Sequence, residues 1–167
     1  MAARRVIEDS IILVRNHLKA NMPQALIDVR TDRIDAQVST EAPKNYFIFT
    51  PAIAYQSPAM FVIAESCDFK LSRGQNHVNA TVKVLCSVVV EDKDAEKLEF
   101  KLFRYHDAIH HLLDNAELDD SAHNVRCVVK VITSDFGQGL KTQSSTETIF
   151  RKEVMFTLDV EHYEKSI

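Results

Sequence analysis

The chain has 167 residues, of which 46% are hydrophobic and 26% charged, with only three glycines and four prolines. This composition is typical of a folded domain with a sizeable core, so we expect residues 1–167 to form a single domain. A formal net charge of −4 and the lack of a Lys/Arg-rich run argue against a surface that grips nucleic acid. The longest aliphatic run, residues 11–14, is too short to span a bilayer. The N-terminus MAARRVIEDS turns acidic too early for a secretory signal.

Three cysteines, Cys67, Cys86 and Cys127, stand in apolar, strand-like stretches and form no CxxC pair. A catalytic thiol needs a neighbouring base and a cationic or helix N-terminal setting, and the surrounding sequence indicates neither. We therefore expect three buried, reduced thiols that pack as small hydrophobic side chains in a reducing compartment.

Residues 3–20 are predicted to form an amphipathic helix. Its apolar positions recur on one stripe, at Ile7, Ile11, Val14 and Leu18. Pro23 cannot continue the helical hydrogen-bond ladder, so the helix is expected to end at residues 21–23. Residues 24–30 fit either a further helical turn or a first strand.

Residues 31–58 contain three of the four prolines and one aromatic strand candidate, Tyr46–Phe49. A connection this long is unusual in a compact domain and often has a task of its own. Two interpretations stay open: a protruding arm or hairpin, or an edge segment of the sheet.

From residue 59 onward the pattern is clearer and predicts strands 59–71 and 77–91, helix 96–117, and strands 124–133 and 147–163. The second strand has seven apolar residues on one face, typical of a half-buried antiparallel strand: Val78, Ala80, Val82, Val84, Cys86, Val88 and Val90. Residues 134–146 are predicted to form a mobile polar surface loop, too long for a tight hairpin. The order predicts an α+β fold: a mainly four-stranded antiparallel sheet, two helices packed on one face, and a long hairpin or arm.

The stretch RYHDAIHHLLDN, residues 104–115, raises the question of a metal site, because His106 and His110 are four residues apart on a predicted helix. The predicted core stripe of this helix is Leu98, Leu102, Tyr105, Ile109, Leu112 and Ala116. At roughly 100° per residue, His106 and His110 flank this stripe and could share a ligand. Two imidazoles are an incomplete ligand set, however, and Asp107 points about 100° away from His106 on the same wheel. We therefore expect partly exposed polar positions and no metal ion.

Phe100 and Phe103 lie about 160° and 140° from the core stripe of the same helix. Exposed phenylalanines on the outer side of a helix usually indicate a second partner. We predict a subunit interface that contains Phe100, Phe103, His106 and His110. The alternative is that a loop such as residues 31–58 covers them.

The remaining motifs indicate no chemistry. Asp135-Phe136-Gly137 spells the kinase metal-binding triplet, but no Gly-rich phosphate loop, strand lysine or catalytic loop accompanies it. No GxGxxG or GxSxG motif appears, and the carboxylates are scattered. We expect a protein that is not an enzyme, has no catalytic residues and needs no cofactor.

The element order carries a resemblance. PAMFVIAES (58–66) opens the sheet, and a long valine strand then passes through an acidic turn into a two-faced helix, VVVEDKDAEKLEFKLFRYHDAIHHLLDN. With two closing strands, this resembles the tail terminator and tail-completion proteins of long-tailed bacteriophages. The resemblance covers residues 3–162 and is one of architecture, so no functional residue is carried over.

The resemblance implies a structural virion protein, made in the host cytoplasm and located in the tail or neck. It implies a hexameric ring that caps the tail tube, contacts the tube protein and the head-side connector, and lets DNA pass without specific binding or any membrane contact. Three alternatives remain: a head-closure or neck connector protein, a small metal-dependent hydrolase that uses His106 and His110, and a stand-alone ligand-binding module.

Overall fold

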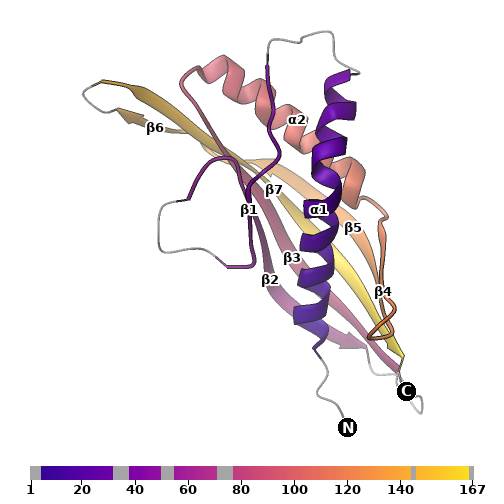
Figure 1. Cartoon of the computed structure of the whole chain (residues 1–167). Helices are drawn as coiled ribbons and strands as arrows, with labels where there is room; N and C mark the ends of the chain where they lie inside the picture. The colour runs from indigo at the N-terminus through magenta and orange to yellow at the C-terminus, as the bar shows by residue number, and fades with distance from the viewer. Residues whose placement is uncertain (1–4, 32–37, 50–54, 71–76, 144–145, 166–167) are drawn as a thin grey trace.

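The structure is a computed structural model that describes residues 5–31, 38–49, 55–70, 77–143 and 146–165. Within these residues, two helices and seven strands follow one another (Figure 1). They are α1 (Val6–Thr31), β1 (Asn45–Phe47), β2 (Ala59–Lys70), β3 (His77–Asp92), α2 (Ala95–Leu113), β4 (Glu117–Asp120), β5 (Val125–Phe136), β6 (Leu140–Gln143) and β7 (Thr148–Lys165).

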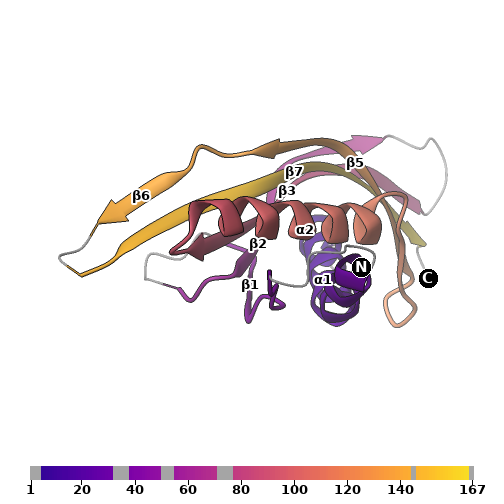
Figure 2. The same ribbon diagram turned by 90° about the horizontal axis from the view of Figure 1, so that it is seen from above.

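All seven strands belong to one curled sheet with the order β1-β2-β3-β7-β5-β4, and β6 pairs with β7. Figure 2 shows both helices on the same side of this sheet. Helix α1 crosses the sheet and contacts β2, β3, β4, β5 and β7, whereas α2 contacts β7, β3 and β5, and the two helices contact each other. The molecule therefore has two layers, a helix layer and a sheet with an opposite, helix-free face.

The predicted α+β class is confirmed, but a mainly four-stranded antiparallel sheet is wrong. Strand β1 pairs with β2 in parallel, so the sheet is mixed, and β4 and β6 add two further short strands. Strands of three or four residues are too short to display a period of two, which is why the sequence pattern does not reveal them.

The core lies between the two layers and is built on alternation along β3. Its seven predicted inward positions, from Val78 to Val90, are all buried, and they pack with the inward residues of β7 and β5 and with both helices. Each fully buried aliphatic side chain contributes about 1.5–3 kcal/mol relative to an exposed one. Among the strands, β3 therefore contributes the largest number of buried side chains to the core.

Helix α1 was predicted to end at residues 21–23, but it continues through Pro23 to Thr31. The apolar stripe continues past the proline. Met22 directly before it and Ala25 and Leu26 after it are all buried. Their burial offsets the missing hydrogen bond, since each long apolar side chain contributes on the order of 2 kcal/mol. At the N-terminal end, Ile7 was predicted to face the core but is 43% exposed, and Val6 is buried in its place.

Helix α2 begins at the predicted place and ends earlier than predicted, at Leu113. The Asp94 carboxylate accepts hydrogen bonds from the backbone N–H groups of Glu96 and Lys97, which satisfies two free donors of the first turn. Asn115 has a φ of 58°, a left-handed conformation that stops helical propagation. The chain then turns into β4 at Glu117.

Residues 134–146, predicted to be a loop, are mostly strand in their described part. Strand β5 continues to Phe136, a bend at residues 137–139 follows, and β6 then pairs with the start of β7. A Cβ atom on Gly137 would lie 2.8 Å from Cγ of Glu153, so glycine allows the close approach of β7 at this bend. The resulting hairpin projects beyond the helix layer (Figures 1 and 2).

The described part of residues 31–58 forms an edge of the sheet. Phe47 of β1 stacks on Phe61 of β2 with ring centroids 5.4 Å apart, and Tyr55 contacts both rings. Together with Val89 they form a small second cluster, separate from the main core. Residues 32–37 and 50–54, where a protruding arm could also lie, are outside the described residues.

The predicted thiols are free, and two of the three are buried. Burial raises the pKa of Cys86 to about 12 and that of Cys127 to about 11, so both stay protonated at neutral pH. Cys67 is only half-buried and packs against the main core from β2.

A buried polar cluster joins α1 to the sheet. The Ser10 hydroxyl donates its single hydrogen to the carbonyl oxygen of Val6, so Nδ1 of His162, 3.0 Å away, must donate to Ser10 Oγ. Nε2 of His162 then carries a lone pair, has no hydrogen-bond partner and lies 3.9 Å from the Glu164 carboxylate. Burial lowers the pKa of His162 despite the opposing effect of Glu164 and Asp9.

Removal of Pro23 is expected to stabilise the fold. The Pro23→Ala substitution adds an N–H donor at an exposed position inside α1 and should raise the free energy of unfolding by about 1–3 kcal/mol. Urea denaturation followed by circular dichroism measures this change. An unchanged or lower stability would mean that the helix needs the bend that proline imposes.

Stability should fall in mild acid because of His162. Since its folded-state pKa lies below the unfolded value of 6.5, the unfolded chain takes up the proton first. The contribution is complete above pH 6.5 and is lost as the pH falls from 6.5 through the folded-state pKa. The difference in Tm between the wild type and His162→Asn, measured from pH 7.5 to 5, should shift in favour of the variant; parallel curves would contradict this assignment.

Candidate functional site

The outer flank of α2 and the start of the projecting hairpin form one aromatic surface. We call Phe100, Phe103, His106, His110 and Phe136 the aromatic patch. Phe100 and Phe103 are 40% and 39% exposed and Phe136 of β5 is 41% exposed. Large apolar side chains exposed together in this way are uncommon on a monomeric surface.

The rings of the aromatic patch contact one another in sequence. Phe103 lies edge-on to Phe100 at 6.4 Å and to Phe136 at 5.7 Å between centroids. His106 stacks on Phe136 at 5.5 Å and on His110 at 6.1 Å. Mutual contacts fix the ring orientations, so the patch is pre-organised and would lose little conformational entropy on binding a partner.

His106 attaches α2 to the sheet. Its ring stacks at 5.2 Å on the fully buried Phe156 of β7, and Nε2 lies 2.9 Å from the Ser134 hydroxyl of β5. Nδ1 lies 3.2 Å from the Asp107 carboxylate. Both ring nitrogens therefore have partners within the chain, and His110 is the exposed member of the pair.

Within the described residues, no group of three or more His, Cys, Asp or Glu side chains is placed to hold a metal ion. His106 and His110 lie side by side, as their spacing predicts, but the groups nearest to His106 are a hydroxyl and a neighbouring carboxylate. This geometry gives the metal-dependent hydrolase no support.

The opposite flank of α2 holds residues 38–44. The Arg104 guanidinium donates to the carbonyl oxygen of Val38, and the Tyr105 hydroxyl donates to the carbonyl oxygen of Glu41. Burial raises the pKa of Tyr105, so the hydroxyl stays a donor. Residues 38–44 therefore pack away from Phe100 and Phe103, and among the described residues Phe136 contacts the ring of Phe103.

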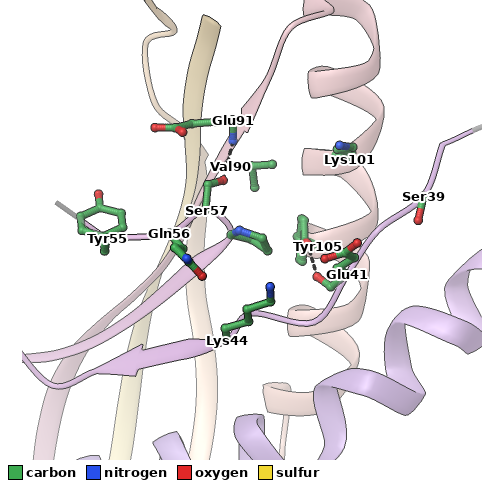
Figure 3. A pocket seen from close by; sticks show the side chains of 11 residues that line it. Ser39, Glu41, Lys44, Tyr55, Gln56, Ser57, Val90, Glu91, Lys101 and Tyr105 are labelled. Carbon is green, nitrogen blue, oxygen red and sulfur yellow. Dashed lines mark hydrogen bonds between the residues drawn. The ribbon is translucent and has the colours of Figure 1, made fainter.

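A cavity of about 550 Å³ lies between residues 39–44, residues 55–58, the end of β3 and α2 (Figure 3). The lining carries charges of both signs, with Lys44 and Lys101 beside Glu41 and Glu91 among its residues. Lys101 is paired with Asp92 at 2.6 Å, and the Ser57 hydroxyl accepts a hydrogen bond from the backbone N–H of Glu91 at 2.8 Å.

The lining of this cavity contains no histidine or cysteine. Its serine hydroxyls therefore have no imidazole base among the lining residues, and its charges balance one another. The geometry defines a polar hollow beside residues 39–44.

Sequence reasoning identified the two phenylalanines of α2 and missed Phe136. The signal was present, because Ser134 and Phe136 continue the inward alternation of Val129 and Val131 after a one-residue bulge. The polar and glycine-rich residues after Phe136 concealed that β5 extends this far.

No protein-family model matches the chain, and no curated protein matches it. Solved structures do match, and one of them is a chain of the "Virion of native gene transfer agent (GTA) particle". The protein is similar to that chain at 14% sequence identity and a TM-score of 0.43, over 95% of this chain and 99% of that chain. A similarity this low carries no functional conclusion. None of the described helices is long and apolar enough to cross a membrane.

The Tyr105 hydroxyl is expected to hold residues 38–44 against α2. Tyr105→Phe should lower the free energy of unfolding by about 1 kcal/mol and speed hydrogen exchange of the backbone at residues 38–44. The matched control is Tyr163→Phe, which removes an exposed hydroxyl bonded to Glu161 and should change stability by less than about 0.5 kcal/mol. Equal effects of the two substitutions would contradict this role.

Proposed function

We propose that this chain is a structural protein of a phage-like virion, a tail terminator that assembles into a hexameric ring between the tail tube and the head-side connector. The virion and terminator roles are supported by the element order, which resembles that family. The ring is supported by the aromatic patch, the single observation that carries the proposal. The chain acts by assembly and performs no catalysis.

The aromatic patch is suited to a protein partner. Binding energy at protein interfaces concentrates in a few large, pre-organised side chains, and aromatic residues are enriched among them. Phe100, Phe103 and Phe136 are such side chains, gathered at one place and left about 40% exposed. His110 and the half-buried His106 supply a polar margin, as interfaces commonly have.

A ring needs one heterologous interface that repeats until the rotation closes. The aromatic patch lies on the β5 side of the molecule, whereas β1 and β2 form the opposite side of the sheet. Unlike surfaces on opposite sides of one chain are what a head-to-tail ring requires, because a self-complementary patch would close after two copies.

Passage of DNA through the ring requires a surface that does not retain phosphate. The helix-free face of the sheet mixes both signs of charge and has more acidic than basic residues. The acidic residues are Glu65, Asp68, Glu91, Glu117, Asp119, Asp135, Glu153, Asp159 and Glu161, and the basic residues are Lys70, Lys83, Arg126, Lys130 and Arg151. A channel lined by this face would hold no continuous stripe of Lys or Arg.

The purified chain should form a ring, alone or on tail tubes. Size-exclusion chromatography with light scattering gives the number of copies, and electron microscopy of virions gives the position of the ring. A particle that lacks the protein would exclude the proposal, and a ring of another symmetry at the neck would favour the head-closure alternative.

Phe103 is expected to be an interface residue. Phe103→Asp should cost about 2 kcal/mol or more per contact, a factor of about 30 in Kd, and should disperse the ring into folded monomers. The matched control is Ile48→Asp, which changes a similarly exposed side chain outside the patch and should leave the ring intact. If Phe103→Asp unfolds the chain, Phe103 belongs to the core; if the ring persists, the patch is not the interface.

A further inference from the structure

Both edges of the sheet are open over part of their length. On one side, β1 covers β2 at residues 59–61, and residues 62–70 of β2 have no strand beside them among the described residues. On the other side, β4 covers β5 at residues 125–128, and residues 130–136 of β5 have none. Neither stretch contains proline, a common device for protecting a strand edge.

The two open stretches lie at the same level of the sheet. Ile63 of β2 pairs with Leu85, Leu85 pairs with Thr157, and Thr157 pairs with Thr133 of β5. The row that contains Ser66 of β2 ends in the same way at Lys130 of β5.

Each edge strand is bulged next to the row that joins Ala64 to Val131. The register shifts between Ala64 and Ser66 in β2 and between Val131 and Thr133 in β5. A bulge bends a strand and turns its edge away from a regular partner. Here both edge strands bend beside the same row of the sheet, so the bent edge of β5 and the bent edge of β2 remain complementary in shape.

The strand directions are also compatible. Each of the pairs β2–β3, β3–β7 and β7–β5 is antiparallel, so β5 runs opposite to β2. A rotation about an axis parallel to the strands preserves their direction. It would place β5 of one copy antiparallel to β2 of the next copy, the pairing that can exchange both backbone hydrogen bonds between facing residues.

Side chains along the two edges are complementary on the helix-free face. Ile63 on β2 and the 51% exposed Ile132 on β5 are apolar. Further along, the exposed Glu65 and Asp68 of β2 would lie near Lys130 of β5. Facing pairs of opposite charge and of apolar residues each stabilise an antiparallel pair by about 0.2–1 kcal/mol.

We propose that residues 130–136 of β5 in one copy pair with residues 62–70 of β2 in the next copy of this chain, so that one sheet runs across every subunit boundary. The backbone groups of both open edges are then satisfied. The proposal deepens the ring of the proposed function and rests on it, since it names the surfaces that close that ring.

The aromatic patch is placed to extend this boundary into the helix layer. His106 and Phe103 contact Ser134 and Phe136, so the patch stands directly beside the open stretch of β5. In the next copy α1 contacts β2 and exposes Ile27. Edge pairing of the sheets brings the outer flank of α2 toward this neighbouring α1. The sheet layer and the helix layer then both contribute to the subunit boundary.

Disulfide trapping tests the pairing. Ile63→Cys with Thr133→Cys, and separately Ser66→Cys with Lys130→Cys, place two thiols opposite each other across the boundary in a Cys67→Ala background. Facing residues in an antiparallel pair have Cα atoms about 4.5–5.5 Å apart, which a disulfide spans. Under mild oxidation we expect a reducible ladder of covalent multimers that ends at the ring size found by light scattering.

The chains with one introduced cysteine are the matched controls, because Cys86 and Cys127 are buried and one accessible thiol allows at most a dimer. A ladder from either double variant, absent in the single variants, supports the pairing. If light scattering shows an intact ring and neither double variant gives a ladder, the edges do not pair and this inference fails while the ring stands. If no oligomer forms up to about millimolar concentration or on tail tubes, the proposed function fails as well.

Discussion

The antiparallel pairing of β3 with β7 is the constraint on which the rest of the structure depends. It extends over all sixteen residues of β3 and places two long runs of apolar side chains on the same face. Because burying this face is the main gain in free energy, both helices must lie on that side. β2 and β5 then extend the sheet outward from this central pair. The other elements either extend this central pair within the sheet or cover its apolar face.

At the two flanks of the sheet, the same arrangement leaves surface uncovered. The described residues form only two helices for a wide sheet, so α2 covers β7 and β5 only in part, and the rings of Phe100, Phe103 and Phe136 stay about 40% exposed. The short strands β1 and β4 cover only the beginnings of β2 and β5. Apolar surface and open backbone groups therefore remain on the two flanks, which is where a repeated subunit contact would satisfy both.

Long, regular elements could be predicted from the sequence and short or irregular ones could not. The alternation of β3 and the spacing of Leu98, Leu102 and Ile109 placed these residues in the core, where they are. The end of α1 was mispredicted because proline is a local signal, whereas Met22 and Leu26 contribute through packing against distant strands. The spacing of His106 and His110 fixed their proximity, but only the fold shows that His106 contacts Ser134 and Phe156.

By itself the sequence determined the α+β class, the apolar face of each long element and the outward position of Phe100 and Phe103, because these depend on periods of 2 and 3.6 residues that are local in the chain. Only the tertiary structure decided which strands lie at the edges, that Phe136 joins the aromatic patch, and that His162 meets Ser10 across 152 residues of chain. Strand order and such contacts depend on which surfaces bury each other best. That is a property of the whole chain and leaves no local pattern in it.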